Sequence, residues 1–210
     1  MGRYLGGQCK VCRREGTKLF LKGIRCNTEK CSFAKRPTPP GMHGMRRASK
    51  PTYYAIQLRE KQKVKRSYGM LEKQFHRFFQ LATKSRGVTG RTLLQLLERR
   101  LDNVVFKALF ASSRNQARQL VLHGSVFIKG KRTNIPSYLV GADQEIEIRV
   151  KDDVKKRIKE RIEVIAKERG VPSWIDVDNN NLKIKIVRLP EKEDIVLAVN
   201  EQLIVELYSK

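Results

Sequence analysis

The segment 100–150 constrains the fold more than any other part of this sequence, because helix signals are followed there directly by strand signals. Apolar residues at helical spacing predict a first helix over 101–109. Ser113, followed three residues later by Gln116, has the form of a capping box and predicts the start of a second helix. Gly124 is typical of a residue just beyond a helix end, so this helix should be short.

Strand signals follow the second helix. The apolar run 126–128 and the alternating residues 145–148 predict strands, and Lys129-Gly130-Lys131 predicts a turn after the first of them. The segment is therefore a small helix-helix-strand-turn-strand module. Its exposed positions are predicted to carry basic side chains: Arg114, Arg118, His123, Lys129, Lys131 and Arg132. An apolar scaffold with such a surface is typical of an RNA-binding module.

The same segment resembles a known family, the S-four type RNA-binding domain. The resemblance is carried by Ser113-Arg114, Ala117-Arg118-Gln119-Leu120-Val121, His123-Gly124, Gly130, Arg132 and Ile135-Pro136-Ser137-Tyr138. The flanking segments are similar to bacterial small-subunit ribosomal protein S-four, nearly along the whole chain and in order. They are Pro39-Pro40-Gly41, His43-Gly44, 58–63, 100–105 and 199–203.

The charge of the chain narrows the class of partner. Lys and Arg number 45 against 21 Asp and Glu, a formal net charge of +24, which favours a polyanion. Basic residues are densest in the first third, whereas 170–210 is slightly acidic and is expected to pack on protein. A membrane span is not predicted, since no apolar run reaches about 18 residues. Nor does the N-terminal sequence resemble a signal peptide.

The four cysteines lie within the first 31 residues, spaced Cys9-x2-Cys12-x13-Cys26-x4-Cys31. Two close pairs joined by a short loop are typical of a four-thiolate metal site, each pair approaching the ion from one tight turn. One structural zinc is the preferred interpretation, and an iron–sulfur cluster is the alternative. Without a metal, the cysteines would form two disulfides or stay as inert thiols. Disulfides are disfavoured, because they persist mainly in exported proteins and nothing in the sequence points to export.

Further RNA contacts are predicted along the first 68 residues. Residues 32–51 have the composition of an extended linker that RNA would order, and 51–68 should form a basic helix carrying tyrosines. An ordinary turn role is the alternative for His43, and at least one of Tyr53 and Tyr54 is expected to lie in the core. The candidates are Arg3, Arg13, Arg14, Lys22, Arg25, Lys35, Arg36, His43, Arg46, Arg47, Lys50, Tyr54, Arg59, Lys61, Lys63 and Arg66.

The remaining elements complete an α+β fold. Helices are predicted over 71–85, 152–169 and 200–208, and strands over 174–177 and 183–187. The predicted architecture is a mostly helical domain with an N-terminal metal knuckle, residues 1–98 completed by 170–210. The S-four type domain, residues 99–169 with its following helix, is inserted into it.

No catalytic motif is present, so the protein is predicted not to be an enzyme. S-four type modules also occur beside catalytic domains, but removing the module leaves no nucleotide-binding pattern. A metal-containing DNA regulator is a further alternative. The resemblance implies a cytoplasmic, ribosomal protein that binds small-subunit rRNA early in assembly. It also implies contact with ribosomal protein S-five, a place in the mRNA entry channel, an influence on decoding accuracy and, in some lineages, binding to its own mRNA. No membrane and no small-molecule substrate are expected.

Arg114 and Arg118 receive a specific hypothesis. They are four residues apart near a helix start. At this spacing two cations repel each other, and the positive end of the helix dipole disfavours both. An RNA phosphate between the two guanidinium groups would reverse that cost. On this hypothesis, replacing either with Ala leaves thermal stability unchanged or higher and weakens RNA binding. The alternative is that both are solvated or pair with an acid such as Asp102.

Overall fold

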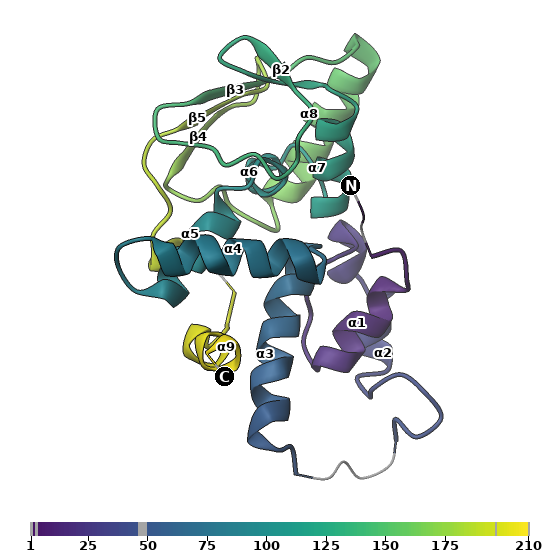
Figure 1. The fold of residues 1–210 in the computed structure, drawn as a ribbon. Coiled ribbons are helices and arrows are strands. Elements are labelled where there is room, and N and C mark those ends of the chain that lie inside the picture. The colour runs from purple at the N-terminus through teal and green to yellow at the C-terminus, as the bar shows by residue number, and fades with distance from the viewer. Residues whose placement is uncertain (1, 3, 46–49, 196, 210) are drawn as a thin grey trace. The chain divides into compact units, whose positions relative to one another are not determined.

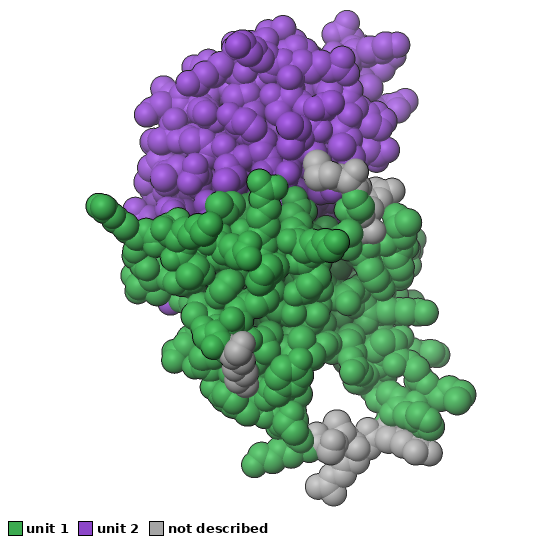
Figure 2. Space-filling view, viewed as in Figure 1, with its two compact units in different colours: residues 1–93, 197–210 green, residues 94–196 purple. Residues whose placement is uncertain are grey.

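The computed structural model describes residues 2, 4–45, 50–195 and 197–209. The chain divides into two compact units, which we call unit 1 (1–93 with 197–210) and unit 2 (94–196) (Figure 2). The predicted RNA contacts Arg3, Arg46 and Arg47 lie outside the described residues. In the described part of the chain, no helix is both long and apolar enough to cross a membrane.

Unit 1 consists of helices in its described part (Figure 1). They are α1 (Gln8–Glu15), the 3-10 helix η1 (Gly23–Cys26), α2 (Ser32–Lys35), α3 (Tyr53–Ser67), α4 (Glu72–Lys84) and α9 (Glu201–Tyr208). Helix α5 (Thr89–Glu98) begins in unit 1 and ends in unit 2. The hydroxyl of Thr52 accepts a hydrogen bond from the Ala55 N–H at 3.2 Å, so α3 begins after Thr52 and not at Pro51.

The buried stripe of α4 confirms the helical spacing of its apolar residues. Phe75, Phe78, Phe79 and Ala82 are all buried. Helix α9 reaches this stripe through Tyr208, whose ring stacks 4.5 Å from that of Phe79, centroid to centroid. The C-terminal helix therefore completes unit 1, as the sequence predicts for the end of the chain.

Unit 2 combines short helices with a small antiparallel sheet. After the end of α5 come α6 (Leu101–Lys107), α7 (Arg114–Leu122), β1 (Val126–Ile128), β2 (Lys131–Thr133), β3 (Glu145–Ile148), α8 (Asp152–Ala166), β4 (Ile175–Asp178), β5 (Lys183–Ile186) and the 3-10 helix η2 (Lys192–Asp194). The strand order is β2-β1-β3-β5-β4. Every residue of α6 is buried, so this helix lies in the core of the unit.

One predicted boundary differs from the structure. From the sequence, 170–196 is assigned to the first domain, but β5 pairs with β3, with Ile184 opposite Ile146. Both isoleucines are buried, and so is Trp174 just before β4. The hairpin β4–β5 therefore extends the sheet of unit 2, and only 197–210 joins unit 1. Cross-strand pairing over this distance in sequence leaves no local signal that could have assigned it.

Candidate nucleic-acid interface

Helix α7 is positioned by its own start signal. The Ser113 hydroxyl accepts a hydrogen bond from the Gln116 N–H at 3.3 Å, which confirms the predicted N-cap. The reciprocal bond of a capping box goes elsewhere. The Gln116 Oε1 accepts hydrogen bonds from the backbone N–H of Ser112 at 2.9 Å and from its hydroxyl at 2.8 Å. The Gln116 side chain thus fixes the position of Ser112, which lies just before the helix.

A buried ion cluster lies between α6 and α7. Asp102 accepts a fork from Arg100, with Nε to Oδ1 at 3.0 Å and Nη2 to Oδ2 at 2.5 Å. Arg118 donates to the same Oδ2 from 3.5 Å. All three side chains are at most 5% exposed. Because water does not reach this carboxylate, its negative charge is stabilised mainly by the two guanidinium groups.

Arg114 is oriented by the same part of the fold. Its Nε donates to Oδ1 of Asn103 at 2.8 Å, and its guanidinium lies over the Phe106 ring, 4.6 Å from the centroid. Asn103 is itself buried and donates to Glu98 Oε2 at 2.7 Å. Arg114 is half-buried, so it is anchored to α6 before any ligand arrives.

The predicted exposed pair on α7 is therefore corrected. Arg118 is buried and pairs with Asp102, which is the alternative left open by the sequence. The spacing of four residues places both arginines on one face, but that face turns partly toward α6. The structure therefore argues against the hypothesis that Arg118→Ala leaves thermal stability unchanged or higher, because the substitution would leave part of a buried carboxylate without its partner.

The β1–β2 hairpin presents the next predicted contacts. Lys129 and Gly130 connect the strands with φ of 48° and 78°, as in the two-residue turns that match strand twist. The side chains of Lys129, Lys131 and Arg132 are exposed around this turn. The hairpin thus brings the predicted cations together at one end of the sheet.

Arg132 also caps helix α7. Its Nε donates to the carbonyl oxygen of Gly124 at 3.0 Å, and its Nη2 donates to that of His123 at 3.1 Å. A cation at these last carbonyls is favoured by the helix dipole. A Cβ on Gly124 would come within 2.1 Å of the Arg132 guanidinium, and the φ of this glycine is 71°. Glycine is needed here both for the turn and for the close approach.

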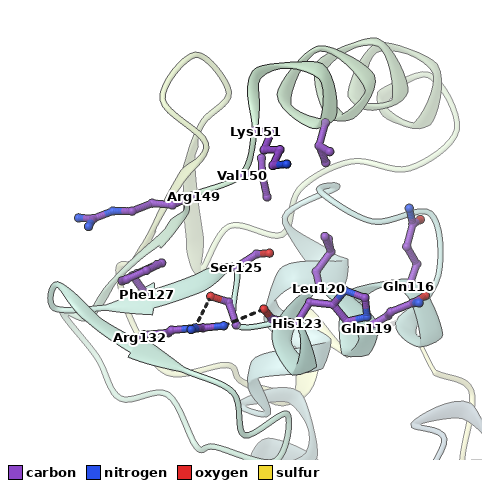
Figure 3. Close-up of a pocket in the computed structure, with 12 residues that line it drawn as sticks. Gln116, Gln119, Leu120, His123, Ser125, Phe127, Arg132, Arg149, Val150 and Lys151 are labelled. Carbon is purple, nitrogen blue, oxygen red and sulfur yellow. Dashed lines mark hydrogen bonds between the residues drawn. The ribbon is translucent and has the colours of Figure 1, made fainter.

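An open groove of about 750 Å³ lies beside this cap (Figure 3). Helix α7 contributes Leu120 to its lining, His123 follows directly after the helix, and the sheet contributes Phe127 and Arg132. The segment after β3 adds Val150, Val154 and the cations Arg149 and Lys151, which were not predicted from the sequence. These two cations could have been predicted from the sequence, because they follow shortly after β3, and β3 pairs with strand β1 of the basic hairpin.

Helix α3 carries its predicted cations differently. Arg59 pairs with Glu15 at 3.2 Å, and Lys61 pairs with Glu72 at 2.8 Å. Lys63 pairs with Glu60, and the Arg66 guanidinium lies 5.0 Å from the ring centroid of Tyr4. Tyr53 and Tyr54 are both exposed, so the expectation that at least one of them lies in the core is wrong. RNA contact by these residues stays a prediction, and the structure assigns most of them a protein partner as well.

The N-terminal arm shows both anchored and exposed cations. Arg13 donates to the carbonyl oxygens of Thr38 at 2.8 Å and Pro39 at 3.2 Å, which holds the proline-rich linker to α1. Arg25 donates to the carbonyl oxygen of Lys30 at 3.4 Å. The remaining described candidates are exposed: Arg14, Lys22, Lys35, Arg36, His43 and Lys50.

The cysteines lie in the same arm and are all free thiols. Cys9 and Cys12 lie on α1, not on a tight turn as predicted, and Cys26 ends η1. Burial raises the pKa of Cys12, and the thiols of Cys26, Cys9 and Cys31 raise it further. Backbone N–H groups of Ala34 and Phe33 lower the pKa of Cys31. Among the described residues, however, no three His, Cys, Asp or Glu side chains are arranged to hold a metal ion.

Comparison with known proteins identifies the family to which both parts of the chain belong. Residues 3–98 match the ribosomal protein S4/S9 N-terminal domain, and residues 99–146 match the S4 domain. The basic hairpin beside α7 thus belongs to an S4-domain protein. Proteins named small ribosomal subunit protein uS4 match over the full length of both chains, at 56% identity in Caldicellulosiruptor saccharolyticus, 54% in Thermodesulfovibrio yellowstonii and 50% in Thermus thermophilus. The chain belongs to the uS4 family of small ribosomal subunit proteins.

Proposed function

We propose that this protein is a structural constituent of the small ribosomal subunit and binds its rRNA directly. The observation that carries the proposal is the full-length similarity to uS4 proteins. The exposed cations of the β1–β2 hairpin and of the arm support it, because clustered Lys and Arg displace counterions from RNA. The role is structural, not enzymatic, in keeping with the family.

The salt dependence of rRNA binding tests this proposal. Each phosphate contact contributes about −0.7 to −0.9 to the slope of log affinity against log salt, so six or more contacts give a slope steeper than about −4. Filter binding of the full-length protein to small-subunit rRNA over a range of KCl concentrations measures it. A slope near −1 would contradict a surface that binds many phosphates.

The finer parts of the role rest on family membership alone. They are early, assembly-nucleating binding, contact with ribosomal protein S-five, a place in the mRNA entry channel, an influence on decoding accuracy, and binding to mRNA. Reconstitution of small subunits with and without this protein tests the first two. Omission should prevent later proteins, S-five among them, from joining the particle.

We also propose that the arm holds one structural metal ion in its cysteines, zinc in preference to an iron–sulfur cluster. Cys9 and Cys12 from α1, with Cys26 and Cys31 from the following segment, would be the ligands. The proposal is supported by the type of donor, because four free thiols are the ligands of structural zinc sites, although the side chains of the described residues are not arranged around one ion position. Such an ion would crosslink a segment whose core is small.

Elemental analysis of anaerobically purified protein tests the metal. About one zinc ion, or one cluster, per chain is expected. Cys12→Ser should release it and expose the arm to protease, while Ser32→Ala serves as a matched control in the same arm. Four titratable thiols together with no metal would overturn the proposal.

A further inference from the structure

The groove beside α7 has a lining unlike that of a purely phosphate-binding surface. Leu120, Phe127, Val150 and Val154 are all half-buried and line it. Phosphate contact needs no apolar surface, whereas an unstacked nucleobase does. The volume of about 750 Å³ lies within the range of about 300–1,000 Å³ typical of small-ligand sites, so a nucleoside fits.

The charge of the groove is complementary to a nucleotide. Arg132, Arg149 and Lys151 line it, and no acid is among the described residues that do. Glu147 is paired with Arg149 at 2.7 Å, and Asp152 and Asp153 begin α8 outside the lining. Positive side chains around an apolar floor match a base with its phosphate.

Arg132 is preorganised for this role. Two of its nitrogens are fixed by the terminal carbonyls of α7, which leaves its other N–H groups for a ligand. Arg149 lies over the Phe127 ring at 4.5 Å from the centroid, so the aromatic and the cation are held together on the sheet side. A guanidinium fork that is already oriented loses little entropy when it binds phosphate.

The α7 side offers groups that can recognise a base edge. Gln116, Gln119 and His123 all line the groove, and Figure 3 shows them along α7, across from Phe127 and Arg132. Because the Gln116 Oε1 already accepts two hydrogen bonds from Ser112, its amide nitrogen remains as the donor. Amide and imidazole groups can pair with the polar edges of a base.

We infer that this groove receives a single unpaired nucleotide of the bound RNA, with its base between Leu120, Phe127 and Val154 and its phosphate at Arg132. The inference rests on the proposed function and deepens it, since it assigns an extruded base, and not only a phosphate backbone, to the S4 domain. It makes part of the affinity independent of salt, because burial of a base releases no counterions.

A substitution that fills the groove tests the inference. Val154→Trp places an indole in the groove from the first turn of α8, and Val164→Trp, exposed on the same helix outside the lining, is the matched control. Full-length variants are titrated with small-subunit rRNA at several KCl concentrations. Val154→Trp should weaken binding about tenfold, the effect of losing one stacked base, with an unchanged salt slope. Val164→Trp should bind as the unsubstituted protein does.

Ultraviolet crosslinking supplies a second readout. The unsubstituted protein should crosslink a base to the peptides that contain Phe127 or His123, and Val154→Trp should lose that crosslink. Thermal unfolding checks that Val154→Trp folds. Should it not, Gln119→Ala, at an exposed position, takes its place and should weaken binding and reduce crosslinking.

The outcomes separate the inference from the proposed function. If the unsubstituted protein binds rRNA with a steep salt slope but Val154→Trp binds equally well, the inference is overturned and the proposed function stands. If the unsubstituted protein itself does not bind rRNA, the proposed function fails. If Val154→Trp binds rRNA normally but cannot join subunits, the groove takes a protein segment, which also overturns the inference.

Discussion

Helices α3 and α7 both carry dense positive charge, yet Glu72, which pairs with two lysines of α3, and Asp102, which pairs with Arg118 of α7, differ in their exposure to water. On α3, Lys61 and Lys65 both reach Glu72, whose side chain is 47% exposed. On α7, Arg118 reaches Asp102, whose side chain is 4% exposed. Water therefore reaches the carboxylate of Glu72 and screens its pairs, whereas the pair of Arg118 with Asp102 is shielded from water. Charge density on a helix therefore does not show whether the charges face a ligand or the core.

Removal of Asp102 should give the largest effect. Asp102→Ala leaves Arg100 and Arg118 buried together without their anion, so unit 2 should lose about 3–5 kcal/mol of stability. Asp176→Ala, an exposed aspartate on β4, is the matched control and should cost less than about 1 kcal/mol. Urea unfolding measures both. Equal effects would remove the distinction between a buried and an exposed aspartate.

Arg118→Ala should come next. Asp102 keeps its fork from Arg100, so the loss is smaller, about 1–3 kcal/mol for a buried polar group left without one partner. Thermal unfolding and rRNA binding are measured together. An unchanged midpoint with weaker RNA binding would restore the interpretation of Arg118 as a phosphate contact and would make α7 resemble an exposed basic helix.

The two glycines of the α7–hairpin region allow a sharper test. Gly130→Ala meets no atom within 4 Å and should cost about 1–2 kcal/mol for its positive φ alone. Gly124→Ala has a similar φ but displaces the Arg132 guanidinium, so it should cost as much and also weaken rRNA binding. Denaturant unfolding and filter binding of both variants isolate the contribution of Arg132. Identical RNA affinities would show that the cap is not part of the interface.

The ion pairs that α3 makes with Glu72 should give the smallest effect. Glu72→Gln should cost less than about 1 kcal/mol, because exposed pairs are screened, and salt should reduce the difference. Gln80→Glu, which adds an exposed acid to α4, controls for the general effect of charge on that helix. A loss comparable to that of Asp102→Ala would mean that the α3 network is shielded from water after all.

The pH dependence of the same network follows from Glu72. Burial acts to raise its pKa, but hydrogen bonds from Lys61, Lys65 and Tyr208 outweigh this and lower the pKa to about 2. Since the folded-state pKa lies below the ordinary value of 4.5, the stabilisation is complete above about pH 4.5 and is lost as pH falls toward 2. Acid unfolding of Glu72→Gln should therefore be shallower in this range than that of the unsubstituted protein.

The sequence by itself determined the local elements of this protein. Ser113, Gly124 and the Lys129-Gly130 turn are recognisable because a cap, a left-handed residue and a two-residue hairpin each depend on a few neighbouring atoms. The buried stripe of α4 and the strands β1 and β3 likewise follow from periodicity. The motifs of the S4 domain depend on the same short stretches, which is why family membership could be predicted.

Only the tertiary structure decided which cations face inward and which strands share a sheet. Arg118 pairs with Asp102, which lies 16 residues earlier in the sequence. Strand β5 pairs with β3, although α8 and β4 lie between them in the sequence. The groove brings Leu120, Phe127 and Val154 together from a helix, a strand and a second helix. Contacts of this kind depend on how whole elements pack, and the spacing of residues within one element carries no information about them.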